Sequence, residues 1–314
     1  METSVLKEFG EKITANCLKV IVGKKEEIFD VIVTFLCSGH ILLEDVPGTG
    51  KTMLLRTFAK TIGGSFKRVQ FTPDVLPSDL TGINFYNPKL SEFEFRAGPL
   101  FANMVLADEI NRATPRTQSS LLEAMAESQI TVDGTTYMMA EPFMIMATQN
   151  PLETHGTFPL PEAQTDRFFM RLSLGYMARE EELSVISGED TLDIIESLVQ
   201  LTTAEEILMM KELCRKVEVG SAVKEYIMDI VEATRNHNRV RIGVSTRGAI
   251  ALYRAVQAAA GLEGRSFSVP EDVQRLASKV LSHRLSLSGL SGTGEDSAII
   301  EDIVKSTAVP LENR

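Results

Sequence analysis

Residues 44–52 read Glu-Asp-Val-Pro-Gly-Thr-Gly-Lys-Thr, and they separate a short strand-like run at 40–43 from a helical pattern at 51–62. The two glycines let the backbone wrap closely, so that its N–H groups point into one concavity and bind phosphate oxygens. The start of the helix adds the positive end of its dipole. The stretch therefore predicts a phosphate-binding loop between a strand and a helix.

The side chains of this loop extend the prediction. Lys51 would reach the β- and γ-phosphates of a nucleotide, and the Thr52 hydroxyl would bind Mg²⁺. Asp45 departs from the GxxxxGK[ST] pattern, because it stands where the first glycine belongs. A chance Gly-Lys-Thr in a loop is the alternative, which the flanking strand and helix disfavour. The residues expected to hold the nucleotide here are Asp45, Val46, Pro47, Gly48, Thr49, Gly50, Lys51, Thr52 and Met53.

A second strand ends in two acids. Residues 104–109 read Met-Val-Leu-Ala-Asp-Glu, so Asp108 and Glu109 follow four apolar residues. Asp108 would hold Mg²⁺, usually through water, and Glu109 would polarise the attacking water as a general base. Two solvated acids at a strand end are the alternative. Their place after a phosphate loop favours the catalytic interpretation.

The next apolar run, 143–147, ends in Thr148-Gln149-Asn150. An amide at this strand end would lie between the two strands already described and would hydrogen-bond the water or the γ-phosphate. We favour Asn150 over Gln149. A turn-forming asparagine before Pro151 is the alternative.

Two arginines are candidates for stabilising the charge that builds on the γ-phosphate during transfer. Arg167 lies beyond the last clear strand signal and is expected to face a neighbouring molecule. Arg247 begins a helix in the second half of the chain and is expected to reach back to the phosphates. Either arginine alone is more often a surface salt-bridge residue.

The whole chain reads as an α/β domain followed by a helical one. Short apolar runs separated by helix-length segments predict a parallel sheet covered by helices. Hairpins are expected at 82–95 and 130–137, the second around the turn Asp133-Gly134. From about residue 203 the strand signal disappears, and capping boxes are expected at Thr203–Glu206 and Ser268–Glu271. The expected divisions are a core at 1–187, a linker at 188–202 and a helical lid at 203–314.

Composition excludes several classes of protein. The net charge of −11 over 314 residues disfavours a nucleic-acid-binding protein, because such binding depends on Lys and Arg that neutralise phosphates. The N-terminus lacks the apolar centre of a signal peptide, and the most apolar run, 31–37, is too short to span a bilayer. Three scattered cysteines without a CxxC pattern indicate a reducing cytoplasm.

Four further stretches carry a resemblance to a known family. They are Gln70 to Gly82, Gly98 to Ala113, Thr117 to Met125 with the Val132-Asp133-Gly134 turn, and Leu160 to Phe168. Together with the loop and the acid pair, they resemble the MoxR family of AAA+ ATPases, from about residue 20 to residue 283. The phosphate loop of this family often reads Glu-Asp-Val-Pro-Gly, so Asp45 fits the resemblance.

The resemblance also implies roles for single residues. Asn150 would be the sensor at the γ-phosphate, Arg167 the finger supplied to the neighbouring subunit, and Arg247 the lid sensor. Val22 and Gly23 resemble the loop that packs against adenine.

The resemblance implies an AAA+ core with two hairpin insertions and a small all-α lid. It also implies a ring, commonly of six subunits, with a chaperone-like role. The usual partners of the family contain a von Willebrand factor A-type domain with a metal-dependent adhesion site. Thr165 departs from the family pattern, where an apolar residue is usual before Asp-Arg-Phe, and this would change how Arg167 is presented.

Three functions are consistent with these features. The first is a cytoplasmic ATPase that uses ATP and Mg²⁺ to remodel a protein client. The second is a nucleotide-gated scaffold with slow turnover, and the third is a metal-chelatase subunit or a nucleic-acid motor. Arg171 is the next candidate for the trans-acting arginine if Arg167 is not.

Overall fold

A computed structural model describes residues 2–46, 48–149, 156–187, 191–288 and 294–310. Its centre is a five-stranded sheet in the order β2-β5-β8-β1-β9, in which all neighbouring strands are parallel. The strands are β1 (Ile41–Glu44), β2 (Phe66–Gln70), β5 (Met104–Asp108), β8 (Met144–Gln149) and β9 (Met170–Leu172). The expected parallel sheet and α/β class are confirmed.

Alternate residues of the central strands enter two separate hydrophobic cores, because successive side chains of a strand point to opposite faces. Ile41, Leu43 and Leu106 pack with the first three helices, whereas Leu42 and Val105 pack with α5. These helices are α1 (Glu2–Cys17), α2 (Lys25–Leu36), α3 (Lys51–Ile62) and α5 (Pro115–Glu127). Burial on both faces explains why the strands read as continuous apolar runs.

Strand β9 was not expected from the sequence. It is three residues long and carries Arg171 between two buried apolar residues, which is too short a stretch to predict a strand by itself. Pairing of Met170 and Leu172 with β1 makes it the edge strand of the sheet. Tertiary pairing, rather than local pattern, therefore decides this strand.

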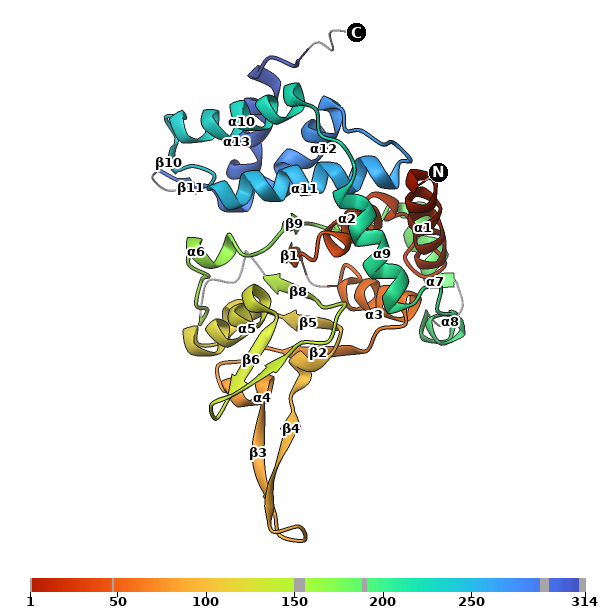
Figure 1. Cartoon of the computed structure of the whole chain (residues 1–314), viewed down its shortest axis with the longest axis vertical. Helices are drawn as coiled ribbons and strands as arrows, with labels where there is room; N and C mark the ends of the chain where they lie inside the picture. Colours follow the sequence, from red (N-terminus) through yellow and green to blue (C-terminus); the bar gives the residue numbers. More distant parts are fainter. Residues whose placement is uncertain (1, 47, 150–155, 188–190, 289–293, 311–314) are drawn as a thin grey trace.

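Both expected hairpins are present. They are β3 (Gly82–Asn87) with β4 (Glu92–Ala97), and β6 (Gln129–Val132) with β7 (Thr135–Met138). Asp133 and Gly134 have φ values of 49° and 82°, as a type I′ turn requires. The β3–β4 hairpin projects far from the body of the molecule (Figure 1). At its base, Phe95 stacks on Tyr137 of the other hairpin with a centroid distance of 4.2 Å.

The C-terminal part is a helical bundle that lies over the α2 side of the core (Figure 1). Its helices are α10 (Ser221–Asn236), α11 (Thr246–Leu262), α12 (Pro270–Leu281) and α13 (Glu295–Ser306), whereas α9 (Ala204–Arg215) lies beside α1 and α2 and also contacts α11 (Figure 1). A small antiparallel pair, β10 (Val240–Ile242) with β11 (Ser286–Leu287), was not expected in this part of the chain. The short helices are α4 (Pro77–Thr81), α6 (Glu162–Thr165), α7 (Arg179–Ser187) and α8 (Thr191–Ser197), with 3₁₀ turns at Pro99–Phe101, Ile110–Arg112 and Ser282–Arg284.

Of the two expected capping boxes, the first is confirmed. Glu206 N donates to the Thr203 hydroxyl, and Thr203 N donates to the Glu206 carboxylate at 2.9 Å. The second box was placed one residue too early. Helix α12 begins after Val269, whose N–H donates to Asp272 at 2.9 Å.

The predicted division of the chain at 188–202 stays a prediction. The described part of that segment holds α8, which packs on α3. The N-terminal helix α1 contacts α3 of the core, α9, and α11 of the bundle.

Candidate nucleotide-binding site

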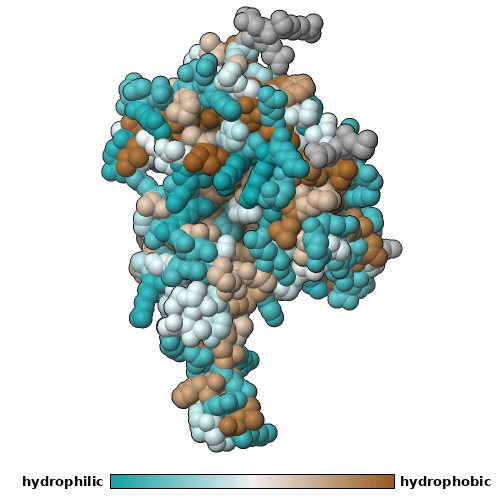
Figure 2. Space-filling model, in the orientation of Figure 1, coloured by the Kyte–Doolittle hydropathy of each residue, from teal (hydrophilic) through white to brown (hydrophobic). Residues whose placement is uncertain are grey.

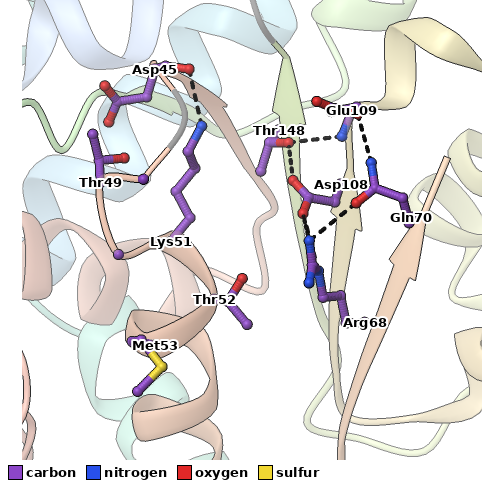
Figure 3. A pocket seen from close by; sticks show the side chains of 12 residues that line it. Asp45, Thr49, Lys51, Thr52, Met53, Arg68, Gln70, Asp108, Glu109 and Thr148 are labelled. Atoms are coloured by element: carbon purple, nitrogen blue, oxygen red, sulfur yellow. Dashed lines mark hydrogen bonds and ion pairs between the residues drawn. The ribbon is translucent and has the colours of Figure 1, made fainter. Parts of the chain in front are cut away.

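A pocket of about 350 Å³ lies at the carboxyl ends of the parallel strands, where ligands bind in open α/β sheets. Figure 3 shows side chains from the phosphate loop facing those from β2, β5 and β8 across it. The described residues that line it are Asp45, Gly48, Thr49, Gly50, Lys51, Thr52, Met53, Arg68, Gln70, Asp108, Glu109 and Thr148. The structure therefore brings the expected loop and the expected acid pair into one pocket.

Backbone conformation explains the two glycines of the loop. Gly48 and Gly50 both have φ of 86°, a region that side-chain-bearing residues rarely adopt. A Cβ atom on either glycine would meet nothing within 4 Å, so the space above this backbone is open. Lys51 begins α3 and donates from Nζ to the Asp45 carbonyl at 3.0 Å. Val46 lies in the same loop, and Pro47 lies outside the described residues.

The Asp45 carboxylate anchors the phosphate loop. Its carboxylate is buried and accepts hydrogen bonds from the N–H groups of Val46 at 3.0 Å, Leu174 at 2.7 Å and Gly175 at 3.1 Å. The aspartate thus ties the phosphate loop to the segment that follows β9. This contact gives a physical reason for an aspartate at the position where the usual pattern has glycine.

Thr148 joins the two acids of β5. Its hydroxyl donates to Asp108 Oδ1 at 2.6 Å and accepts from the Glu109 N–H at 2.8 Å. The other oxygen of Asp108 accepts from Arg68, with Nη2 at 2.5 Å. These contacts orient the Asp108 carboxylate at the edge of the pocket (Figure 3).

Glu109 is held in a strained conformation. Its φ of 59° and ψ of 51° lie in the left-handed region, which costs a non-glycine residue of order 1–3 kcal/mol and is concentrated at functional sites. Gln70 Nε2 donates to Glu109 Oε2 at 2.6 Å, and Arg112 lies 3.2 Å from the same oxygen. The carboxylate is therefore aimed by a side chain from the neighbouring strand.

Sequence reasoning did not select Arg68, Gln70 or Thr148. The register pairs Gln70 with Asp108, so the end of β2 lies beside the end of β5. Gln70 and Thr148 each stand at the end of a strand next to β5. Because the ends of parallel strands meet at one edge of the sheet, this position was the signal that could have identified both residues. Arg68 lies two residues before Gln70 on the same strand face.

The residues of this pocket fit a magnesium-bound nucleoside triphosphate. The open backbone concavity suits phosphate oxygens, and Lys51 adds a cation beside it. Thr52 and Asp108 supply a hydroxyl and a carboxylate, which are the oxygen ligands that Mg²⁺ prefers. Asn150, the expected γ-phosphate sensor, lies outside the described residues.

The expected adenine loop lies next to the segment after β9. Gly23 has φ of 74°, and a Cβ atom there would lie 2.0 Å from Glu181 Oε1 of α7. Lys24 donates to the Tyr176 carbonyl at 3.1 Å. Val22 is half-buried, and neither it nor Gly23 is among the residues that line the phosphate pocket.

The two candidate arginines meet in a second pocket, of about 240 Å³, together with Asp166 and Arg284. Arg167 donates from Nη1 to the Leu122 carbonyl of α5 at 2.7 Å. Arg247 is exposed and lies 3.6 Å from Asp166. Neither arginine is among the described residues that line the phosphate pocket.

Two residues near Arg167 in the sequence, Thr165 and Arg171, form contacts within the chain. Thr165, the departure from the family pattern, donates its hydroxyl to the Glu162 carbonyl at 2.9 Å and so closes α6. Arg171 is largely buried and is held by Glu44 at 3.1 Å and by Asp296 at 2.7 Å. The guanidinium of Arg171 is therefore occupied within the chain.

Comparison with known proteins agrees with this geometry. The model of the ATPase family associated with various cellular activities (AAA) matches residues 40–170, and that of the AAA lid domain matches residues 232–303. The chain is 48% identical to protein YeaC of Bacillus subtilis, over 96% of this chain and 95% of that protein. It is 37% identical to Chaperone MoxR1 of Mycobacterium tuberculosis, over 96% and 83% of the two chains.

Two more relatives extend the comparison. Protein MoxR of Paracoccus denitrificans is 32% identical over 86% of each chain. The crystal structure of a Cytophaga hutchinsonii protein superposes with a TM-score of 0.89 at 36% identity, over 99% of this chain and 97% of that one. Within the described residues, the helices are all too short or too polar to cross a membrane. With relatives named MoxR aligned along most of its length, the chain belongs to the MoxR family of AAA+ ATPases.

Proposed function

We propose that this ATPase is a subunit of a ring, in which each nucleotide site is completed by an arginine of the neighbouring subunit. The observation that supports this most is the separation of the catalytic set into two pockets. Lys51, Asp108 and Glu109 line one pocket, whereas Arg167 and Arg247 line the other. A head-to-tail contact that joins the first pocket of one copy to the second pocket of the next closes into a ring when its rotation permits.

Within one site, the proposed roles follow from the contacts. Lys51 binds the β- and γ-phosphates, and Thr52 and Asp108 hold Mg²⁺, which offsets phosphate charge when bound. Glu109 accepts a proton from the attacking water, with its carboxylate aimed by Gln70. Arg167 and Arg247 of the adjacent subunit stabilise the charge that develops on the γ-phosphate.

Lys51→Ala is expected to abolish ATP binding, because it removes the cation beside the backbone concavity. Binding is measured by titration with a fluorescent ATP analogue. Lys60→Ala is the matched control, since Lys60 is an exposed lysine of the same helix that does not line the phosphate pocket. Affinity of Lys51→Ala within about twofold of the wild type would contradict the assignment of this pocket.

We further propose that the ring remodels a protein client and that the β3–β4 hairpin contacts it. Tyr86 and Phe93 are cross-strand partners on one face of that hairpin, 52% and 72% exposed, with ring centroids 5.4 Å apart. Leu90, in the turn between the two strands, adds an exposed apolar side chain, and Figure 2 shows hydrophobic surface at the far end of the projecting hairpin. Apolar surface held far from the body of a protein indicates an interaction site. One relative carries the name Chaperone MoxR1, which agrees with this role.

Finer points remain predictions from the resemblance. These are a ring of six subunits, a cytoplasmic location and a client with a von Willebrand factor A-type domain. The net charge of −11 still disfavours nucleic acid as the client.

The double variant Tyr86→Ser/Phe93→Ser is expected to lower client stimulation of ATP turnover at least about threefold, because it removes two aromatic contacts of about 0.5–1.5 kcal/mol each. The measurement is the ratio of turnover with and without casein, an unfolded model client. Leu183→Ser/Ile186→Ser on α7 is the matched control, since it also removes two exposed apolar side chains. Equal loss of stimulation in both variants would contradict a specific role for the hairpin.

A further inference from the structure

The segment that carries Arg167 is attached to the helical bundle at several points. At its start, Glu162 accepts from Arg241 at 2.5 Å and from the Ser286 hydroxyl. Just before Arg167, Asp166 contacts the bundle through Ser245 at 3.3 Å and through Arg247 at 3.6 Å. Toward the core, Arg167 donates to the Leu122 carbonyl of α5, the buried Phe168 packs in the core that contains α5, and Phe169 N donates to the His40 carbonyl at 2.8 Å.

Arg284 makes the central attachment. Its Nε donates to Asp166 Oδ1 at 3.0 Å, and its two terminal nitrogens donate to the carbonyls of Phe168 at 2.6 Å and Phe169 at 3.3 Å. One guanidinium thus contacts residues on both sides of Arg167. The five N–H donors of arginine are fixed in a planar fork, so these three bonds restrict both position and orientation of the segment.

Burial of Arg284 makes the loss of its partner costly. The Arg284 side chain is 2% exposed, and burial lowers its pKa to about 10 while Asp166 opposes that shift. The guanidinium is therefore still charged at neutral pH, and a buried charge must keep its partner. A Cβ atom on Gly248 would lie 2.8 Å from Arg284 Cδ, so the first turn of α11 packs directly on the same side chain.

We infer that Asp166 and Arg284 are positioning residues for Arg167, so that the helical bundle, in addition to the core packing of Phe168 and Phe169, sets where this subunit presents its arginine. The inference rests on the proposed action of Arg167 on a neighbouring site. Movement of the bundle would then move Arg167, and the state of one subunit would reach the next through Arg284 and Asp166. Arg247 shares the Asp166 carboxylate and takes part in the same contact.

Asp166→Asn is expected to lower kcat for ATP about 10²-fold, since a misplacement of about 1 Å has that effect, while KM stays within about twofold. The reason for the split is that Asp166 is not among the residues that line the phosphate pocket of its own chain. Arg284→Lys, which keeps the charge and loses the fork, is expected to give the same pattern. Arg239→Met with Glu295→Gln removes an exposed ion pair of the bundle at 2.8 Å and serves as the matched control.

Rings assembled from two variants test whether Asp166→Asn misplaces Arg167 or only destabilises the subunit. Asp166→Asn subunits, which retain Glu109, are assembled with Glu109→Gln subunits, which retain a correctly placed Arg167. Turnover per Asp166→Asn subunit is expected to rise toward the wild-type value as the Glu109→Gln fraction increases. A variant that is merely misfolded would not be rescued, and absence of rescue would overturn the inference.

Arg167→Ala separates the proposed trans role of Arg167 from the proposed positioning role of Asp166 and Arg284. If Arg167→Ala keeps wild-type turnover, the proposed trans role itself is wrong. If Arg167→Ala loses turnover but Asp166→Asn and Arg284→Lys keep kcat at an unchanged melting temperature, the positioning inference alone is wrong. Should Asp166→Asn lower the melting temperature, Arg284→Lys in the same mixed rings decides, since it preserves the buried charge.

Discussion

Glu109→Gln is expected to lower ATP turnover by about 10²–10⁴-fold, the usual contribution of a general base. The amide has nearly the same shape as the carboxylate, so Gln70 still has an oxygen to bind, but the amide cannot accept a proton from water. ATP affinity is expected to stay within about twofold of the wild type, because Lys51 and the two loop glycines are untouched. Phosphate release at saturating ATP and a binding titration measure the two quantities.

The matched control is Glu123→Gln, an exposed acid of α5 that does not line the pocket. Equal and near-zero turnover in the wild type and in Glu109→Gln would instead favour a scaffold that uses nucleotide only to time assembly. Because Glu109→Gln binds without hydrolysing, it is also the variant in which an assembled ring with its client is expected to persist. The protein that remains bound to it would show whether a von Willebrand factor A-type domain is present.

Arg167→Ala is expected to lower kcat about 10³-fold, at the lower end of what an arginine supplied to a transferring phosphate contributes. Its own phosphate pocket stays intact, so ATP binding is retained. Mixed with Lys51→Ala subunits, it is expected to regain turnover, because each subunit then supplies what the other lacks. The measurement is turnover against mixing ratio, with a maximum between the two inactive ends.

Arg215→Ala is the control for loss of an arginine. The Arg215 side chain is 64% exposed and forms an ion pair with Glu212 of the same helix at 2.7 Å. A mixing curve without a maximum would show that Arg167 does not act between subunits. Arg171, the other candidate, could not then take over without leaving Glu44 and Asp296. Breaking such a largely buried ion pair costs about 3–5 kcal/mol.

The features that sequence predicted correctly are those whose signal is local. The strand–loop–helix arrangement around Lys51, the acid pair Asp108-Glu109 at the end of β5 and the Asp133-Gly134 hairpin are each coded by adjacent residues. The capping box at Thr203 is equally local, and it was also correct. The box expected at Ser268 was wrong because two acids in succession, Glu271 and Asp272, leave the register of the cap open until the helix packs.

Residues that act through neighbours in space were harder to predict. Gln70 reaches Glu109 from a strand 39 residues away in sequence, and Thr148 reaches Asp108 from one 40 residues away. The resemblance to a family marked Gln70 only as the start of a motif and not as a partner of Glu109. Pairing of β2, β5 and β8 in one parallel sheet converts these distant positions into one hydrogen-bonded group.

The sequence by itself determined which candidate residues stand at the site: Lys51 and Thr52 on a glycine loop, and Asp108 and Glu109 at the end of an apolar strand. Local backbone preference and strand pattern suffice for that. Only the tertiary structure decided where the arginines lie. Arg284 meets Asp166 across 118 residues, and Arg247 lies with them in the second pocket. The physical reason is that docking of the helical bundle onto the core depends on buried contacts spread along the whole chain, which no single stretch encodes.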